Sequence, residues 1–236
     1  MSTGAPLTAQ SAPPAAEAAP PAERWLVTLS LAAGLIYPFL DDRFGLVADV
    51  TLKGLGVAAL ALAAFVNKGK GFRWLAAIMA AGALGDMLLE VPGAFFIGAG
   101  SFALGHCLAI GFYGTNRRLP MTLVPRIAAA LLILYGLAMP TLVTPPGTPV
   151  GAETLYAVLL CGMAAAMLLS RFAFSSGTGP LGVAGALLFV LSDTFLIMRL
   201  GGTLVGGETV HGLIVWYSYY LGQLLIFLGV ARTLRT

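Results

Sequence analysis

Two aspartates in this sequence each lie inside a long apolar stretch. Asp86 follows Gly85, and Asp193 follows Ser192. If these stretches cross a membrane, an ionised side chain there costs roughly 2.5 to 3.5 kcal/mol, so each carboxyl needs a partner, a bound proton or a water-filled cavity. Two carboxyls that share a cavity can act as a general acid and a companion carboxylate, as they do in glycoside hydrolysis. Asp86 and Asp193 are therefore our candidate catalytic residues.

A further set of residues combines a polar side chain with apolar surroundings. Each carries a charge or a hydrogen-bonding group that could contact a polar substrate or a water molecule. They are Lys53, Glu90, His106, Ser192, Tyr219, Tyr220 and Gln223. We take them as candidate substrate-binding residues.

Three of these residues also have a simpler interpretation. Lys53 either contacts a phosphate group or serves a structural purpose, by reaching the membrane interface or pairing with an aspartate. Glu90 shares a helix face with Asp86, yet it lies beside Pro92, where a solvated helix end would explain it. His106 either contacts a substrate or donates a hydrogen bond between helices.

Several familiar chemistries are excluded by what the sequence lacks. It contains only 2 histidines, so one chain cannot build a three-histidine zinc site. The GxSxG, Walker and HExxH motifs of lipases, nucleotide hydrolases and zincins are absent. We expect neither a metal ion nor a cofactor, and a pair of carboxylates remains the main candidate.

Composition and length predict the elements that position these residues. The chain has 236 residues, of which 58% are hydrophobic and 10% are charged, whereas an ordinary soluble domain is about 25% charged. Apolar segments of about 20 residues, long enough to cross a bilayer, recur along nearly the whole chain. They lack the alternating pattern of barrel strands, so their backbone must be helical in lipid. We predict an all-α, polytopic membrane helix bundle of about eight transmembrane helices.

The predicted spans cover 24–40, 46–66, 72–91, 95–114, 123–143, 151–171, 180–200 and 211–233. The first is the weakest, because it is short and ends at Pro38 before Asp41, so a tilted or partly inserted helix is an alternative. Residues 1–23 are rich in Ala and Pro and lack the basic flank and apolar core of a signal peptide. We expect a disordered tail there, followed by one membrane domain over 24–236.

Lysine and arginine are distributed unevenly between the two sides of this predicted bundle. With the N-terminus in the cytoplasm, ten of the 13 lie on the cytoplasmic side and two, Arg43 and Arg199, on the other, while Lys53 lies within a span. Because positively charged loops are retained in the cytoplasm, we expect both termini there. This bias also explains the net charge of +3, and we infer no nucleic-acid binding.

The direction of each span gives the depth of its polar residues, at roughly 1.5 Å per residue. Lys53 lies about two turns below the outer face, and Asp86 and Asp193 lie in the outer half. His106, Tyr220 and Gln223 lie near the midplane. We therefore expect a water-accessible cavity between the midplane and the outer face.

Short motifs along the spans are similar to those of one family of membrane proteins. In chain order they are Lys53, Gly85-Asp86-Met87-Leu88-Leu89, Phe96-Ile97-Gly98 with Phe102 and His106, Gly185-Ala186-Leu187-Leu188-Phe189-Val190-Leu191-Ser192-Asp193, and Tyr219-Tyr220-Leu221-Gly222-Gln223-Leu224-Leu225-Ile226. This order resembles the YhhN family, whose characterised members are lysoplasmalogenases. The resemblance covers the chain from Lys53 to Gly229.

The resemblance implies hydrolysis of the vinyl ether bond of a lysoplasmalogen to a fatty aldehyde and a glycerophospho-head group. Asp86 and Asp193 would be the acid–base pair, in either order, and Lys53 would bind the phosphate as a point charge. Hydrogen bonds to the head group or to water would come from His106, Tyr220 and Gln223. The partners would be a lysophospholipid and water, in the cytoplasmic membrane if the chain is bacterial, and nothing in the sequence fixes an oligomeric state.

Two other classes of function use the same residues. A carrier of small solutes or protons could employ membrane-embedded Asp and Lys residues as a relay, and a faint echo between residues 81–84 and 184–187 would suit its two halves. A lipid-binding or scaffolding protein would need the polar groups only to hold its helices together. Solute movement without release of aldehyde would favour the carrier.

Overall fold

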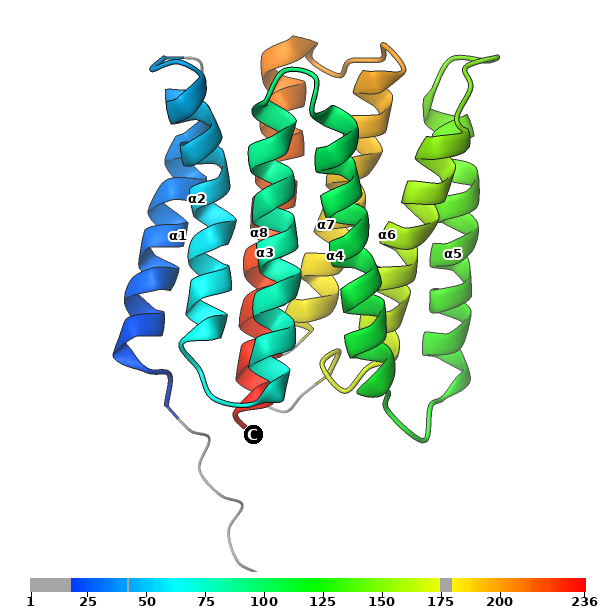
Figure 1. The fold of residues 1–236 in the computed structure, drawn as a ribbon. Helices are drawn as coiled ribbons and strands as arrows, with labels where there is room; N and C mark the ends of the chain where they lie inside the picture. The colour runs from blue at the N-terminus through cyan, green and yellow to red at the C-terminus, as the bar shows by residue number, and fades with distance from the viewer. Residues whose placement is uncertain (1–17, 42, 175–179) are drawn as a thin grey trace, which may run out of the picture.

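The computed structural model describes residues 18–41, 43–174 and 180–236, which form eight α-helices and no β-strand (Figure 1). Each helix lies where the sequence predicts a span, and consecutive helices run in opposite directions (Figure 1). The helices are α1 (Pro21–Leu40), α2 (Leu46–Phe65), α3 (Lys70–Glu90), α4 (Phe95–Thr115), α5 (Leu123–Val143), α6 (Gly151–Leu169), α7 (Leu181–Leu200) and α8 (Gly207–Leu234).

Seven of these helices, α2 to α8, are long and apolar enough to cross a membrane. Helix α1 is not among the seven, because its 20 residues include Glu23 and Arg24 in the first turn and Pro38 near the end. It still packs beside α2 along the length of the bundle (Figure 1). The predicted all-α, polytopic membrane bundle is confirmed, with its first span the least apolar of the set.

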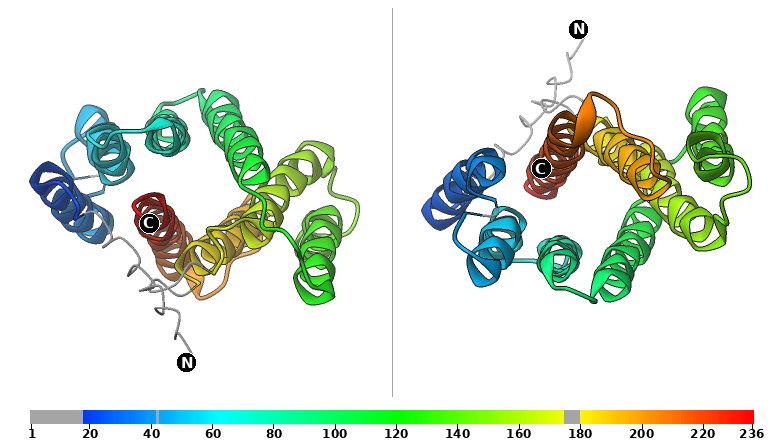
Figure 2. Two further views of the ribbon diagram at one scale, coloured as in Figure 1. Left: turned by 90° about the horizontal axis from the view of Figure 1, so that it is seen from below. Right: turned by 90° about the horizontal axis from the view of Figure 1, so that it is seen from above.

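Six of the helices form a ring when the bundle is viewed along its length (Figure 2). The order around the ring is α2, α3, α4, α6, α7 and α8, and α8 closes it by packing on α2 and α3. Helix α1 packs outside on α2 and α8, while α5 packs outside on α6 and α7 (Figure 2). Side chains from these six helices, together with the end of α1, can therefore share one interior.

Helices α7 and α8 approach closely through facing glycines. A Cβ atom built on Gly185 would lie 2.5 Å from the carbonyl oxygen of Gly222, and one built on Gly222 would lie 2.8 Å from that of Gly185. Small residues let helix backbones pack tightly in a membrane, where burial of apolar side chains gives little drive for association. This contact fixes the position of α7 relative to α8, and with it the positions of Asp193 and Tyr219.

The start of α1 and the end of α8 lie together at the lower end of the bundle in Figure 1. There Glu23 forms an ion pair with Arg235 and accepts a hydrogen bond of 2.7 Å from Asn67. An even number of helices puts both ends on one side, as the distribution of basic residues predicts. That this side faces the cytoplasm stays a prediction.

Helix α1 begins earlier than expected. Its first turn, residues 21–23, falls in the segment that we predicted to be a tail. A proline at the start of the helix and an acidic residue in the first turn both favour a helix start, and Glu23 is only 4% exposed because of its contacts with the other helices. Residues 1–17 of the predicted tail lie outside the described residues.

The lower half of the ring is filled by apolar side chains. Leu60 on α2, Leu75 and Met79 on α3, and Phe227 on α8 are all fully buried there. The polar residues of the interior lie instead toward the opposite, upper end.

Candidate functional site

A cavity of ≈ 700 Å³ occupies the upper part of the ring, and every helix except α5 contributes to its wall. Part of the wall is apolar, including Leu89, Phe102 and Phe189. The polar residues of the wall are Tyr37, Asp41, Lys53, Asp86, Glu90, Tyr156, Ser192, Asp193, Arg199, Glu208, Thr209 and Tyr219. Asp86 on α3 and Asp193 on α7 thus line the same cavity.

Asp86 is buried and receives a hydrogen bond from across the ring. The hydroxyl of Tyr219 on α8 donates to its Oδ2 at 2.8 Å. Gln223 lies four residues further along α8, on the same helix face, and its amide donates to the Tyr219 oxygen at 3.4 Å. A chain of donors therefore runs from Gln223 through Tyr219 to Asp86.

Asp193 is buried in a matching arrangement. The hydroxyl of Tyr156 on α6 donates to its Oδ2 at 2.8 Å. Nε2 of His106 on α4 lies 3.4 Å from the same hydroxyl oxygen. A phenol has one proton, so when Tyr156 donates to Asp193 the imidazole Nε2 must act as the donor to Tyr156.

Each carboxyl therefore accepts a hydrogen bond from its own tyrosine, Asp86 from Tyr219 and Asp193 from Tyr156. Neither forms an ion pair with a lysine or arginine in the part of the chain that the structure describes. They lie within electrostatic range of each other. Two buried carboxyls at one cavity, each held by a phenol, could pass a proton to a bound molecule and orient a water.

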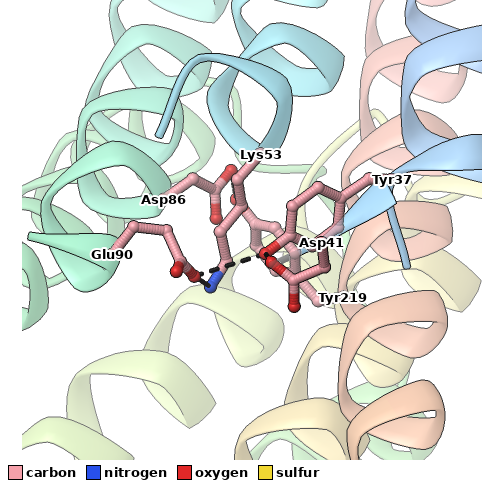
Figure 3. A network of polar contacts seen from close by, with 6 residues as sticks. All are labelled: Tyr37, Asp41, Lys53, Asp86, Glu90 and Tyr219. Atoms are coloured by element: carbon pink, nitrogen blue, oxygen red, sulfur yellow. Dashed lines mark hydrogen bonds and ion pairs between the residues drawn. The ribbon is translucent and has the colours of Figure 1, made fainter. Parts of the chain in front are cut away.

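A polar network lies between Asp86 and the end of α1 (Figure 3). Lys53 forms an ion pair with Glu90, and both side chains are mostly buried. The Tyr37 hydroxyl lies 2.9 Å from Oδ1 of Asp41 and 3.3 Å from Oε1 of Glu90, so its single proton is directed to one or shared by both. The Lys53 ammonium group also lies 5.9 Å from the centre of the Tyr37 ring.

This network shows which partners Lys53 and Glu90 have. Glu90 is not a solvated helix end, because its side chain is only 24% exposed and forms an ion pair with Lys53 on α2. The partner of Lys53 is this glutamate and not an aspartate. Both residues still face the cavity, so the pair presents a positive and a negative group to whatever occupies it.

A second ion pair lies at the outer end of the cavity. Arg199, on the last turn of α7, is 2.9 Å from Glu208, on the first turn of α8. Both side chains are largely exposed. The cavity therefore carries two pairs of opposite charges, one inside it and one at its outer end.

The hydroxyls of Ser192 and Tyr220 both form contacts between helices. Ser192 lies in the cavity wall, but its hydroxyl donates to the Val215 carbonyl at 2.9 Å and so links α7 to α8. Tyr220 does not line the cavity: its hydroxyl lies 3.0 Å from that of Ser30, and its ring covers Gly34 on α1. Successive residues of a helix point about 100° apart, since 3.6 residues make a turn. The expectation that Tyr220 contacts a substrate here is not supported.

His106 and Gln223 lie behind the tyrosines rather than in the wall of the large cavity. Both line a second, smaller cavity of ≈ 20 Å³ near the middle of the bundle. Tyr113 also lines it, and its hydroxyl has no hydrogen-bond partner among the described residues. This volume is about that of one water molecule. His106 and Gln223 are therefore placed to position Tyr156 and Tyr219.

Tyr156 is the residue that sequence inspection missed. It lies in the sixth predicted span, from which we selected no candidate residue, yet it is the partner of Asp193. The depth argument could have found it, because Tyr156 is about a turn and a half from the outer end of its helix, at the level of Asp193. Tyr37 and Arg199 are two further polar residues of the cavity wall that we did not select.

Within the described ranges, no group of three or more His, Cys, Asp or Glu side chains is arranged to hold a metal ion. Comparison with known proteins gives one match: the model of the YhhN family matches residues 48–230. This range includes both aspartates and both tyrosines that bind them. No curated protein and no solved structure matches the chain.

Proposed function

The chain belongs to the YhhN family, and on this premise we propose that it hydrolyses the vinyl ether bond of lysoplasmalogens. The products would be a fatty aldehyde and a glycerophospho-head group. The observation that most supports the proposal is that Asp86 and Asp193, from separate helices, line one cavity and each accept a phenol hydrogen bond.

The chemistry of a vinyl ether explains why two carboxyls are suitable. Protonation of the β-carbon converts the C=C–O group to an oxocarbenium ion. Water then adds to the carbon bonded to oxygen and loses a proton, which gives a hemiacetal. The hemiacetal collapses to an aldehyde and the free hydroxyl of the glycerol. The reaction consumes one water, and the proton that is donated first is recovered from that water.

One carboxylic acid and one carboxylate serve these steps. The acid donates the proton to carbon, while the carboxylate stabilises the cation and takes the proton of the attacking water, as in glycoside hydrolysis. Two like charges in a poorly hydrated cavity repel, so a form that holds a single proton between Asp86 and Asp193 is the one we propose to be active. Tyr156 and Tyr219 hold the two carboxyls in place.

The charged pairs suit a zwitterionic head group. A choline or ethanolamine phosphate carries one negative and one positive group. Lys53 with Glu90, and Arg199 with Glu208, offer both signs in the same cavity. Complementary charges contribute orientation and selectivity more than raw affinity. We propose that the phosphate lies toward the cations and the ammonium group toward the glutamates.

The test is an aldehyde-release assay on purified protein. A vinyl ether lysolipid is compared with its saturated ether analogue, since only the former can be protonated at carbon. We expect aldehyde from the first alone, and its loss in Asp86→Asn and Asp193→Asn variants that are folded and inserted. Native rates in both variants would overturn the assignment of the pair, and absence of aldehyde with the native protein would overturn the function.

A further inference from the structure

A narrow apolar groove lies beside the large cavity. Its volume is ≈ 90 Å³, and it lies between the first turns of α4 and α6 and the last turns of α7. Apart from Glu153 and Tyr156, the residues that line it are all apolar. Its outer edge is formed by Phe96 and Leu200, which are 81% and 50% exposed. These side chains lie on membrane-spanning helices, so the groove opens toward lipid.

The groove shares four wall residues with the cavity that holds the aspartates. Leu89, Phe102, Tyr156 and Leu196 line both. These four residues form a neck, with the groove on one side and the polar cavity on the other. Tyr156 marks the point where the surroundings change, because its ring lines the groove while its hydroxyl donates to Asp193 at 2.8 Å.

A polar cavity with charged pairs, beside an apolar groove open to lipid, matches one kind of molecule. It is an amphiphile with a single hydrocarbon chain, whose head group occupies the cavity and whose chain leaves through the groove. The groove is too small for two chains side by side. We infer that it binds the first carbons of the alkenyl chain and presents the bond next to them, at the neck, to Asp193. This inference rests on the proposed function for the identity of that bond.

The neck also separates the roles of the two aspartates. The β-carbon of a vinyl ether is the one nearer to the chain, so it lies on the groove side of the bond. Asp193 accepts its hydrogen bond from Tyr156, which lines the groove, whereas Asp86 accepts its hydrogen bond from Tyr219, which does not line it. Asp193 is therefore the proton donor, and Asp86 is the carboxylate that faces the cation and the water.

The groove acts through orientation and contributes little to affinity. Moving a chain from lipid into an apolar groove removes no apolar surface from water, so it releases little free energy. Holding the reacting carbon near the acid, by contrast, affects the rate strongly, since a misplacement of about 1 Å can cost about 100-fold. Filling the groove should therefore lower the rate for substrates that need it.

The experiment fills the groove from two walls. Ala99→Phe on α4 and Ala152→Phe on α6 place a ring in it. Leu104→Phe is the matched control, because Leu104 lies on α4, is exposed and does not line either cavity. We expect both groove variants to lower kcat/KM for a long-chain vinyl ether lysolipid roughly 10- to 100-fold. For a substrate whose alkenyl group is cut down to the vinyl carbons, both groove variants should have the same kcat/KM as the native protein.

A second measurement tests the groove without turnover. A saturated ether lysolipid with a photoactivatable diazirine on the first chain carbons is cross-linked to the native protein, and the labelled residues are mapped. Labelling of the groove walls of α4, α6 and α7, lost in Ala99→Phe, supports the inference even if no vinyl ether is hydrolysed. Labelling confined to other surfaces, or equal losses for long and short substrates, overturns it even if aldehyde is released.

Discussion

Tyr156 on α6 donates a hydrogen bond of 2.8 Å to Oδ2 of Asp193 on α7. This contact joins two helices of the ring at the level of the cavity. A buried carboxyl that loses its only phenol donor is less well positioned, and leaving a buried polar group without a partner costs about 1 to 3 kcal/mol. The pair is thus the most direct place to test the site.

Tyr156→Phe is expected to lower kcat/KM for the vinyl ether substrate by about 10- to 100-fold, because about 1.4 kcal/mol corresponds to a factor of ten. The measurement is the steady-state rate of aldehyde release. Tyr135→Phe is the control: its hydroxyl lies 2.9 Å from Thr194, next to Asp193, but Tyr135 is outside the cavity. Equal activity of the two variants would contradict the role of Tyr156.

Tyr219→Phe and Tyr220→Phe compare neighbours on one helix. Tyr219 donates to Asp86, whereas Tyr220 contacts Ser30 on α1. We expect Tyr219→Phe to reduce activity by about tenfold or more, and Tyr220→Phe to reduce thermal stability slightly with activity unchanged. The two readouts are aldehyde release and the unfolding temperature in detergent. A loss of activity in Tyr220→Phe alone would show that the assignment of the two phenols is reversed.

His106 should act through Tyr156 and not on the substrate. His106→Ala removes the group at 3.4 Å from the Tyr156 hydroxyl. His106→Ala should lower kcat less than Tyr156→Phe does. The double variant should have nearly the same kcat as Tyr156→Phe alone, because the effects of substitutions in one hydrogen-bond network are not additive. A double-mutant cycle on kcat checks this. Fully additive losses would mean that His106 has a separate role.

The Lys53–Glu90 pair should contribute to stability as a unit. Lys53→Met leaves Glu90 without its cation, and Glu90→Met leaves Lys53 without its anion. Each single change should destabilise the protein by about 1 to 3 kcal/mol, and the double change by less than the sum. The measurement is a double-mutant cycle on the free energy of unfolding. Additive single effects would show that the two charges are not coupled.

Gly222→Ala should disturb the contact of α7 with α8. Its Cβ would lie 2.8 Å from the Gly185 carbonyl oxygen, and forcing extra atoms into a packed contact costs about 1 to 3 kcal/mol. Gly111→Ala, on α4, meets no atom within 4 Å and should leave stability unchanged or raise it by up to about 1 kcal/mol. Unfolding temperatures of the two variants give the comparison, and equal values would contradict the packing argument.

The sequence by itself determined the helices and the depth of their polar residues. Apolar runs long enough to cross a bilayer have one solution in lipid, because each backbone amide must find its partner within its own helix. Each span therefore became a helix, and its direction placed Asp86 and Asp193 at one level. Helix ends were predicted less well: α1 begins at Pro21 and α8 at Gly207, three and four residues before the predicted spans. Near the start of α1, Glu23 meets Arg235 from the other end of the chain.

Only the tertiary structure decided which polar side chains meet. The partners Tyr156 and Asp193 are separated by 37 residues, and Tyr219 and Asp86 by 133. Which helices adjoin, and how each is rotated about its axis, depends on close contacts such as Gly185 with Gly222. A rotation of about 100° separates Tyr219 in the cavity from Tyr220 against α1. Hydropathy indicates how deep a residue lies in the membrane but not which way its side chain faces. The depth of the site could therefore be predicted from the sequence, whereas the contacts between its side chains could not.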